Sequence, residues 1–89
     1  MIQATVAVYP IGQGDYAAVD RAIEQLRHAG LAMDVRAMHT EISGDAATVF
    51  AALAAAFRVA AEAGGVVMTV TVTNACPVPP SPDLATTER

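Results

Sequence analysis

Apolar and polar residues alternate in two segments of this chain, residues 2–9 and 66–73, in the pattern of a strand with one buried face. In residues 2–9 the larger aliphatic side chains take the even positions and smaller or mildly polar ones the odd positions. Residues 66–73 repeat this pattern, almost wholly β-branched, with threonines on the odd positions. We therefore expect a strand in each segment. We expect Pro10 to end the first, because proline has no N–H to donate to a ladder.

Two more strands are predicted in the middle of the chain. Alternation over residues 31–37 indicates a second strand, and residues 40–43 fit a shorter third one. The turn between them is expected near Met38 and His39.

Two segments with apolar residues three and four positions apart predict amphipathic helices. The first covers about residues 15–29 and the second residues 45–63, with Asp15 and Asp45 as the expected N-caps. Gly30 and the Gly64-Gly65 pair are expected to end them. The expected apolar stripes are Tyr16, Val19, Ile23 and Leu26 on the first helix, and Val49, Phe50, Leu53, Phe57 and Ala60 on the second.

The order strand-helix-strand-strand-helix-strand defines the fold class. With right-handed crossovers it is an α+β, ferredoxin-like βαββαβ sandwich, an antiparallel sheet with two helices on one face. We assign residues 1–77 to this single domain. Residues 78–89 are rich in Pro, Ser and Thr, and we expect them to form a disordered tail.

One face of this sheet is expected to pack on Val19, Ile23, Leu53 and Phe57. The other is expected to be bare and uncharged, carrying Thr5, Ala7, Thr69, Thr71 and Thr73. A bare face of this kind in a small domain often meets another copy of the chain, so we expect a homodimer or homotetramer.

Charge and composition limit the partners. The chain has 89 residues, nine Asp and Glu, five arginines and a net charge of −4, without a clustered basic face. We therefore expect no nucleic-acid binding. We also expect no secretory signal and no apolar run long enough to span a bilayer, hence a soluble cytoplasmic protein without membrane insertion.

The most polar run inside the otherwise apolar domain, residues 38–45, is the candidate binding segment. Thr40 can both donate to and accept from a heterocycle, although strand propensity is a sufficient explanation of a threonine there. Glu41 can attract a cationic ligand, as can Asp45, which also suits an N-cap. Tyr9 can stack on a ring or fill the edge of the core.

Catalytic residues are not evident in this pattern. Two histidines and one cysteine, scattered along the chain, do not make a closed zinc site. Neither Ser43 nor Thr40 has an evident base and orienting group. From the residues alone we expect a binding or interaction domain that is not an enzyme and carries no metal or cofactor.

Several short segments, in their order along the chain, resemble the YkoF-type family that binds thiamine and hydroxymethylpyrimidine. The similarity runs from about residue 2 to residue 77. Related single-domain thiamine-binding proteins match these segments less well. The segments are Val6-Ala7-Val8-Tyr9-Pro10, Gly14-Asp15-Tyr16, His39-Thr40-Glu41-Ile42-Ser43-Gly44-Asp45, Val49-Phe50, Ala56-Phe57-Arg58 and Thr73-Asn74-Ala75-Cys76-Pro77.

The resemblance implies an ACT-like domain without catalysis, active in thiamine or pyrimidine salvage beside a transporter of thiamine precursors. It places ligand contacts on the first strand just before Tyr-Pro and on the Ser/Thr of the third-strand motif, which here means Ala7 and Thr40. Ala7 has no polar side chain, so only its backbone or small size can serve. Family members carry two such domains in tandem, whereas this chain carries one.

Two alternatives stay open from the sequence. One is a ferredoxin-like oligomerisation or regulatory module without thiamine affinity. The other is an enzyme of the dimeric α/β-barrel type, which requires a titratable pair that the sequence does not display.

Overall fold

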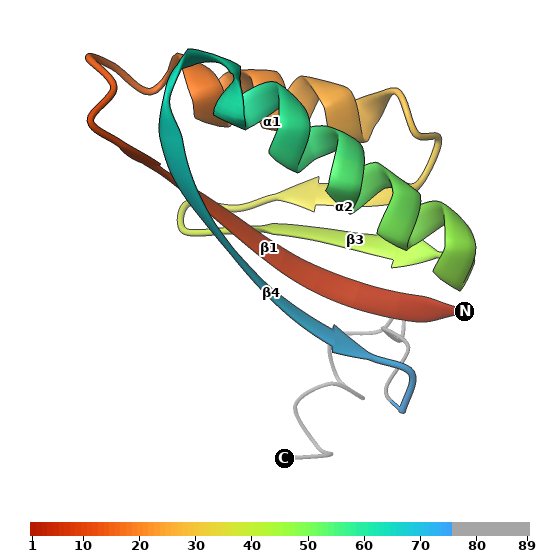
Figure 1. Ribbon diagram of the computed structural model, residues 1–89. Helices are drawn as coiled ribbons and strands as arrows, with labels where there is room; N and C mark the ends of the chain where they lie inside the picture. The colour runs from red at the N-terminus through yellow and green to blue at the C-terminus, as the bar shows by residue number, and fades with distance from the viewer. Residues whose placement is uncertain (76–89) are drawn as a thin grey trace.

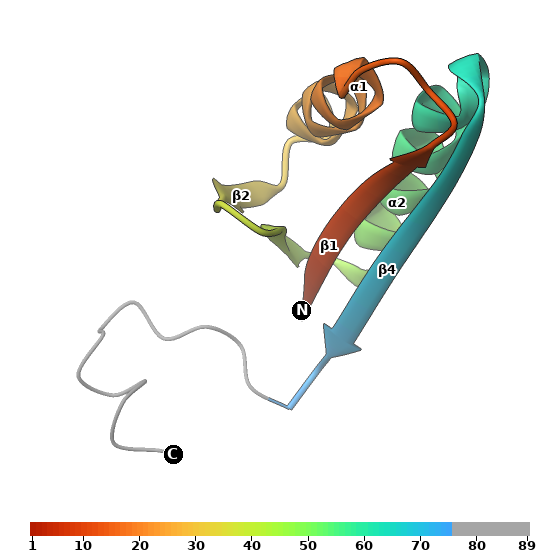
Figure 2. The ribbon, with the colours of Figure 1, turned by 90° about the vertical axis from the view of Figure 1, so that its left-hand side faces the viewer.

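A four-stranded antiparallel sheet carries both helices on one face in the computed structural model, which describes residues 1–75 (Figures 1 and 2). The strand order is β2-β3-β1-β4. This arrangement confirms the expected ferredoxin-like fold. The expected tail, residues 78–89, lies outside the described residues. The elements are β1 Ile2–Ile11, α1 Ala17–Arg27, β2 Ala32–Val35, β3 Thr40–Gly44, α2 Ala46–Ala60, a 3-10 helix η1 Ala61–Ala63 and β4 Gly65–Thr73.

The central strand β1 is paired unequally on its two sides. With β4 it pairs from Gln3 to Ile11, but with β3 only from Ile2 to Val6, which lies opposite Thr40. The expectation that Pro10 ends the strand is therefore wrong. Beyond Val6 the strand has a free edge, and at such an edge a residue without an N–H is tolerated.

The expected N-cap is confirmed for α2 but not for α1, where Tyr16 occupies the N-cap position without a side-chain cap hydrogen bond and Asp15 precedes it. Asp45 caps α2: its Oδ2 accepts from the Thr48 amide at 3.2 Å and from the Thr48 hydroxyl at 3.3 Å. Asp15 accepts from the Ala17 amide at 3.0 Å, so α1 begins two residues later than predicted and ends at Arg27. At the end of η1, Gly64 has a φ of 155°, which side-chain-bearing residues rarely adopt.

Small residues dominate the core between the helices and the sheet. Alanine is the commonest fully buried residue, so both helices approach the sheet, and one another, closely. Leu26, Ile42 and Val49 are the largest side chains sealed completely inside. The buried apolar residues are Ala4, Val6, Ala18, Ala22, Leu26, Ile42, Val49, Ala52, Leu53, Ala56 and Ala60.

The predicted apolar stripes are partly wrong for this reason. Tyr16, Phe50 and Phe57 were expected inside, yet they are 76%, 55% and 43% exposed. On α2 the face turned to the sheet is Val49, Leu53 and three alanines. The space beneath this helix is filled by alanine-sized side chains, and the rings lie outside it.

The expectation that no apolar run is long enough to cross a membrane is also too strict. Helix α2 with η1, Ala46–Ala63, reaches 18 residues with a mean hydropathy of 1.5. By length and composition alone, this segment is long and apolar enough to cross a membrane. The helix is nevertheless packed by one face on the sheet, as core helices of globular domains are.

The close helix packing predicts a strong size limit at Ala56, which is completely buried. Ala56→Leu should lower the free energy of unfolding by about 1–3 kcal/mol, because added methylene groups overpack a filled core. Urea unfolding measures this. Ala54→Leu on the exposed side of the same helix is the matched control and should change stability by less than about 0.5 kcal/mol. Equal effects of the two substitutions would contradict the close approach.

Candidate functional site

A pocket of about 250 Å³ lies where β1 extends beyond β3. Three elements enclose it: the second half of β1, the inner side of α1, and the turn 36–39 between β2 and β3. Its lining is mainly apolar. The lining residues are Val6, Ala7, Val8, Tyr9, Val19, Ala22, Ile23, Leu26, Arg36, Ala37, Met38, His39 and Thr40.

Thr40 brings a hydroxyl group to the inner end of this pocket. Thr40 is 5% exposed. Among the described residues it is the one buried polar residue. It makes no side-chain hydrogen bond within residues 1–75. Every side-chain N or O atom that is sealed from solvent has a hydrogen-bond partner among these residues. Because the Thr40 hydroxyl has no such partner, it is not sealed. The Thr40 oxygen therefore opens into the pocket, where it can donate and accept.

The free edge of β1 supplies the other polar groups. Successive residues of a strand direct their N–H and C=O groups to alternate sides. Residues 7–11 have a strand partner only on the β4 side. Within the described chain, the backbone groups pointing the other way meet no β3 residue. These groups lie along the pocket wall beside Thr40. The pocket is therefore apolar, with one wall of unpaired backbone N–H and C=O groups that can hydrogen-bond to a flat heterocycle.

Charged residues hold the turn that closes the pocket. The Arg36 amide donates to the His39 carbonyl at 2.8 Å, and the Arg36 guanidinium lies 2.9 Å from the Asp34 carboxylate. His39 Nε2 is 3.1 Å from Glu41 Oε2, with both side chains about one-third exposed. Arg36 and His39 thus each have an acidic partner two residues away on the same arm of the hairpin, and the Arg36–His39 backbone hydrogen bond joins the two arms.

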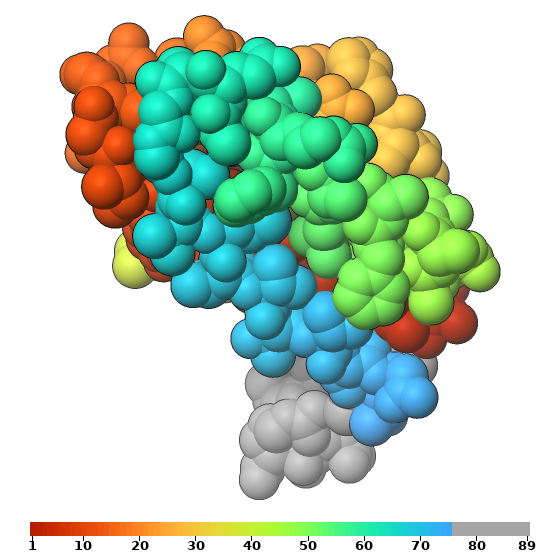
Figure 3. Space-filling view, in the orientation of Figure 1, coloured from red at the N-terminus to blue at the C-terminus, as the bar shows by residue number. Residues whose placement is uncertain are grey.

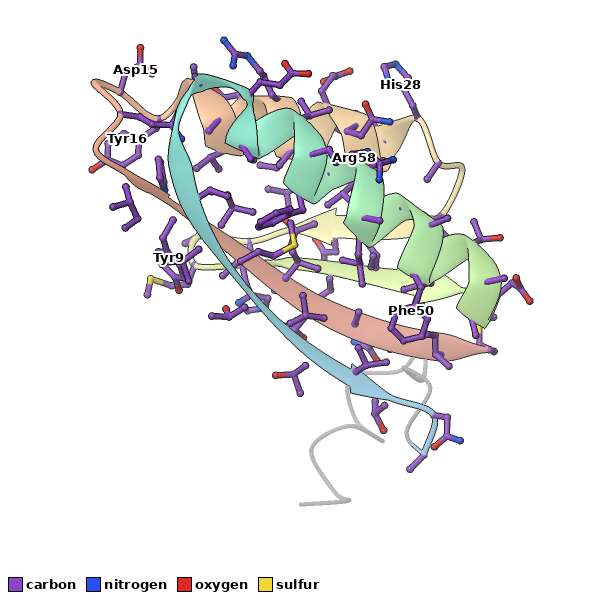
Figure 4. The ribbon with its side chains drawn as sticks, in the orientation of Figure 1. Tyr9, Asp15, Tyr16, His28, Phe50 and Arg58 are labelled. Atoms are coloured by element: carbon purple, nitrogen blue, oxygen red, sulfur yellow. The ribbon has the colours of Figure 1, made fainter. Side chains whose placement is uncertain are left out.

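The structure divides the predicted site residues between the two faces of the sheet. Thr40 points to the helix side, as its burial and its pairing with buried Val6 show. Ala7 and Tyr9 also line the pocket as part of β1, although strand alternation directs their side chains to the face opposite Val6. Tyr9 is 47% exposed and lies at the end of β1 near the turn (Figure 4).

Glu41 and Ser43 belong to the opposite, open face. Side chains alternate along β3, so these two point away from Thr40. With Gln3 they line a second, shallower depression of about 220 Å³. Asp45 lies at the far end of β3, where its carboxylate is engaged by Thr48.

Sequence reasoning missed the α1 wall of the pocket. Val19 and Ile23 were assigned to the core, but they are only half-buried and line the pocket, while Ala18 and Ala22 fill the core beside them. The spacing of Val19 and Ile23 placed both on one side of the helix. It gave no sign that this side faces a space rather than the sheet. Within residues 1–75 no three His, Cys, Asp or Glu side chains gather as metal ligands.

Comparison with known proteins places the chain in context. Residues 1–79 match the model of the YKOF-related Family. No match appears among curated proteins.

Three solved structures share the fold at low identity. A DUF77 domain of unknown function from Bacillus cereus is 22% identical, with a TM-score of 0.76 over 93% of this chain and 84% of that one. A Streptococcus pneumoniae protein is 22% identical, with a TM-score of 0.78 over 97% of both chains. A Thermotoga maritima protein, proposed to act in thiamine biosynthesis or salvage, is 17% identical, with a TM-score of 0.78 over 99% and 98%.

The open hydroxyl of Thr40 generates a prediction about stability. Thr40→Val should leave the free energy of unfolding unchanged or raise it by up to about 1 kcal/mol, because no hydrogen bond within the described chain is lost. The reverse change at a fully buried position away from the pocket, Val49→Thr, should cost about 1–3 kcal/mol by burying a hydroxyl in the core. Thermal and urea unfolding of both variants measure this. A large loss of stability in Thr40→Val would mean that its hydroxyl is a structural group.

Proposed function

Because the chain belongs to the YKOF-related family, we propose that it binds thiamine or its hydroxymethylpyrimidine half without changing it chemically. The family and the Thermotoga maritima structure support a thiamine-related role. The observation that carries the finer proposal is the pocket itself, an apolar space with the Thr40 hydroxyl and the free β1 edge along one wall.

The size of the pocket favours the pyrimidine half as the buried part. At about 250 Å³ it falls just below the range of about 300–1,000 Å³ found for sites that bury drug-sized ligands. One substituted six-membered ring suits this volume better than the whole of thiamine. The ring nitrogens and exocyclic amine of an aminopyrimidine need acceptors and donors in one plane. A strand edge with a neighbouring hydroxyl offers both.

The cationic thiazolium ring then lies at the pocket mouth, near the turn 36–39. Arg36 is neutralised there by Asp34. Glu41 is partnered by His39, a side chain that carries charge only when it is protonated. The Glu41 carboxylate points to the opposite face of the sheet, so it acts on a cation at the mouth only at a distance. Tyr9, half-exposed at the rim, offers an aromatic face for the same cation.

The biological role that follows is the salvage of thiamine or its pyrimidine in the cytoplasm, with a transporter of thiamine precursors as the partner. This part of the proposal rests on the family alone. A regulatory module without thiamine affinity is the competing reading, and a binding measurement separates the two.

Ligand binding is tested by titration of the purified protein with thiamine, its phosphates and hydroxymethylpyrimidine. Calorimetry should detect binding. The melting temperature should rise with ligand concentration, because a ligand that binds only the native state stabilises it by mass action. The vitamer should be recovered intact by mass spectrometry. The absence of both heat and a thermal shift would favour the regulatory module, and a consumed vitamer would identify an enzyme.

The role of Thr40 is tested by Thr40→Val, which keeps the β-branched shape and removes the hydroxyl. Loss of a hydrogen bond to a buried ring should cost about 1–3 kcal/mol, which weakens the dissociation constant roughly 5- to 150-fold. Thr69→Val, on the exposed open face of β4, is the matched control and should bind like the wild type. Unchanged affinity in Thr40→Val would remove this hydroxyl from the site.

A further inference from the structure

Only alternate residues of β1 can present backbone groups to the pocket, because successive residues of a strand direct their N–H and C=O groups to opposite sides. The β2–β3 hairpin shows which residues these are. The Arg36 amide donates to the His39 carbonyl at 2.8 Å. In the hairpin register this pair comes directly after the pair Val35–Thr40. Because hydrogen-bonded and non-hydrogen-bonded pairs alternate along an antiparallel ladder, His39 directs its backbone groups toward β2 and Thr40 directs its own toward β1.

The same alternation carries over to β1. Thr40 lies opposite Val6, so these two residues exchange hydrogen bonds and Val6 directs its backbone groups toward β3. By alternation Val8 and Pro10 point the same way, whereas Ala7 points toward β4, with which it pairs. Figure 3 shows the side of the molecule on which β4 and α2 cover most of β1. The free backbone groups in the pocket thus belong to Val8 and Pro10, and not to Ala7, on which the family resemblance placed a contact.

Pro10 supports this assignment independently. Proline has no N–H, so within a sheet it is tolerated where its nitrogen faces away from the partner strand. Pro10 lies opposite Val66 of β4, and the pairing continues beyond it to Ile11. The nitrogen of Pro10 therefore faces the free side of β1, as the register of the hairpin requires.

The free side of β1 presents a fixed order of groups beside the pocket. Strand β3 offers no partner beyond Val6. Within residues 1–75, no turn, loop or side-chain hydrogen bond reaches Val8 or Pro10. In chain order the groups are the Val8 N–H, the Val8 C=O and the Pro10 C=O, which is a donor followed by two acceptors. The end of β1 and the hairpin turn diverge beneath α1 around this edge (Figure 2).

The other polar groups of the pocket lining impose no such order. The Thr40 hydroxyl both donates and accepts, so it suits either kind of ligand atom. Arg36 and His39 each have an acidic partner. The backbone of β1 cannot rotate, because β4 holds it along its other side. The choice between donors and acceptors on a ligand is consequently made by Val8 and Pro10.

We propose that the Val8 N–H and C=O bind the ring nitrogen and the neighbouring amine of the heterocycle, and that Pro10 makes this edge select a ring amine over a ring carbonyl. This inference rests on the proposed function, because it assigns the groups that recognise the same ligand. In an aminopyrimidine an acceptor nitrogen lies directly beside an amine that donates. The N–H and C=O of one strand residue offer the complementary pair, as they do to the opposite residue in a hydrogen-bonded pair of strands.

Pro10 sets this preference by the N–H that it lacks. Any other residue at this position would add a donor to the free side, next to the Val8 carbonyl. That donor would face the ligand amine, which is itself a donor, and would suit a ring carbonyl instead. With proline in place, only acceptors follow the Val8 N–H. The ligand class is therefore a flat heterocycle with a ring nitrogen beside an exocyclic amine, and not the oxo form of the same ring.

Amide hydrogen exchange followed by NMR tests the assignment of the free groups without any ligand. The Val8 amide should exchange at least about tenfold faster than the Ala7 and Tyr9 amides, because those two are hydrogen-bonded to β4. Added hydroxymethylpyrimidine should slow exchange at Val8 and shift its amide proton downfield, as a new hydrogen bond does. A Val8 amide as protected as that of Ala7 in the free protein would overturn the assignment.

Selectivity is tested by calorimetric titration with hydroxymethylpyrimidine and with its analogue that carries an oxo group in place of the amine. The wild type should bind the amine form roughly 10- to 100-fold more tightly, which is the effect of one mismatched buried hydrogen bond. Pro10→Ala adds an N–H to the free edge and should lower this ratio at least about threefold by strengthening the oxo analogue. Ile11→Ala is the matched control, because the Ile11 backbone faces β4 and the residue lies outside the pocket lining. Its ratio should equal that of the wild type.

The outcomes separate this inference from the proposed function. The inference would be overturned, with the proposed function left standing, by equal wild-type affinity for the two compounds, by a Val8 amide that does not respond to bound ligand, or by an unchanged ratio in folded Pro10→Ala. Absence of binding by both compounds would overturn the proposed function and this inference with it. Circular dichroism establishes that each variant is folded. If Pro10→Ala does not fold, the wild-type selectivity and the response of the Val8 amide decide between the outcomes.

Discussion

The unequal pairing of β1 is the constraint on which the candidate site depends. One side of this strand is hydrogen-bonded to β4 as far as Ile11, while the other loses its partner after Val6. An unpaired backbone is costly in an apolar interior but useful at the wall of a pocket, where a ligand can take the place of the missing strand. The turn 36–39 and the inner side of α1 close this space, and Thr40, the first residue of β3, adds its hydroxyl at the boundary.

The alanine-rich core has a related effect on the outer surface. Helices that bury Ala18, Ala22, Ala52, Ala56 and Ala60 lie too close to the sheet and to each other for aromatic rings to fit between them. The rings of Phe50 and Phe57 are consequently placed outside, over the flank of α2 that borders β4. Close packing of alanines in the core thus leaves aromatic side chains exposed on the surface of the molecule.

Much of the fold could be read from local pattern. The alternation of residues 66–73 and the capping residue Asp45 each depend on chemistry within one segment, and both predictions are confirmed. Pro10 was misjudged, because its tolerance depends on whether a strand lies beside it. Phe50 and Phe57 were misjudged because hydrophobicity ranks side chains by transfer energy and does not include the space available. The separation of Thr40 from Glu41 and Ser43 followed from strand alternation, yet the sequence did not say which face the helices cover.

The sequence by itself determined the order of the elements, the antiparallel ferredoxin-like class, the family and the single polar segment around Thr40. These depend on periodicity, caps and motifs, which act over a few residues. Only the tertiary structure decided that β3 stops short of β1, that Val19 and Ile23 line a space rather than fill the core, and that β4 is a bare edge beside two exposed rings. Each of these depends on the relative lengths and distances of elements far apart in the chain, and no local pattern carries that information.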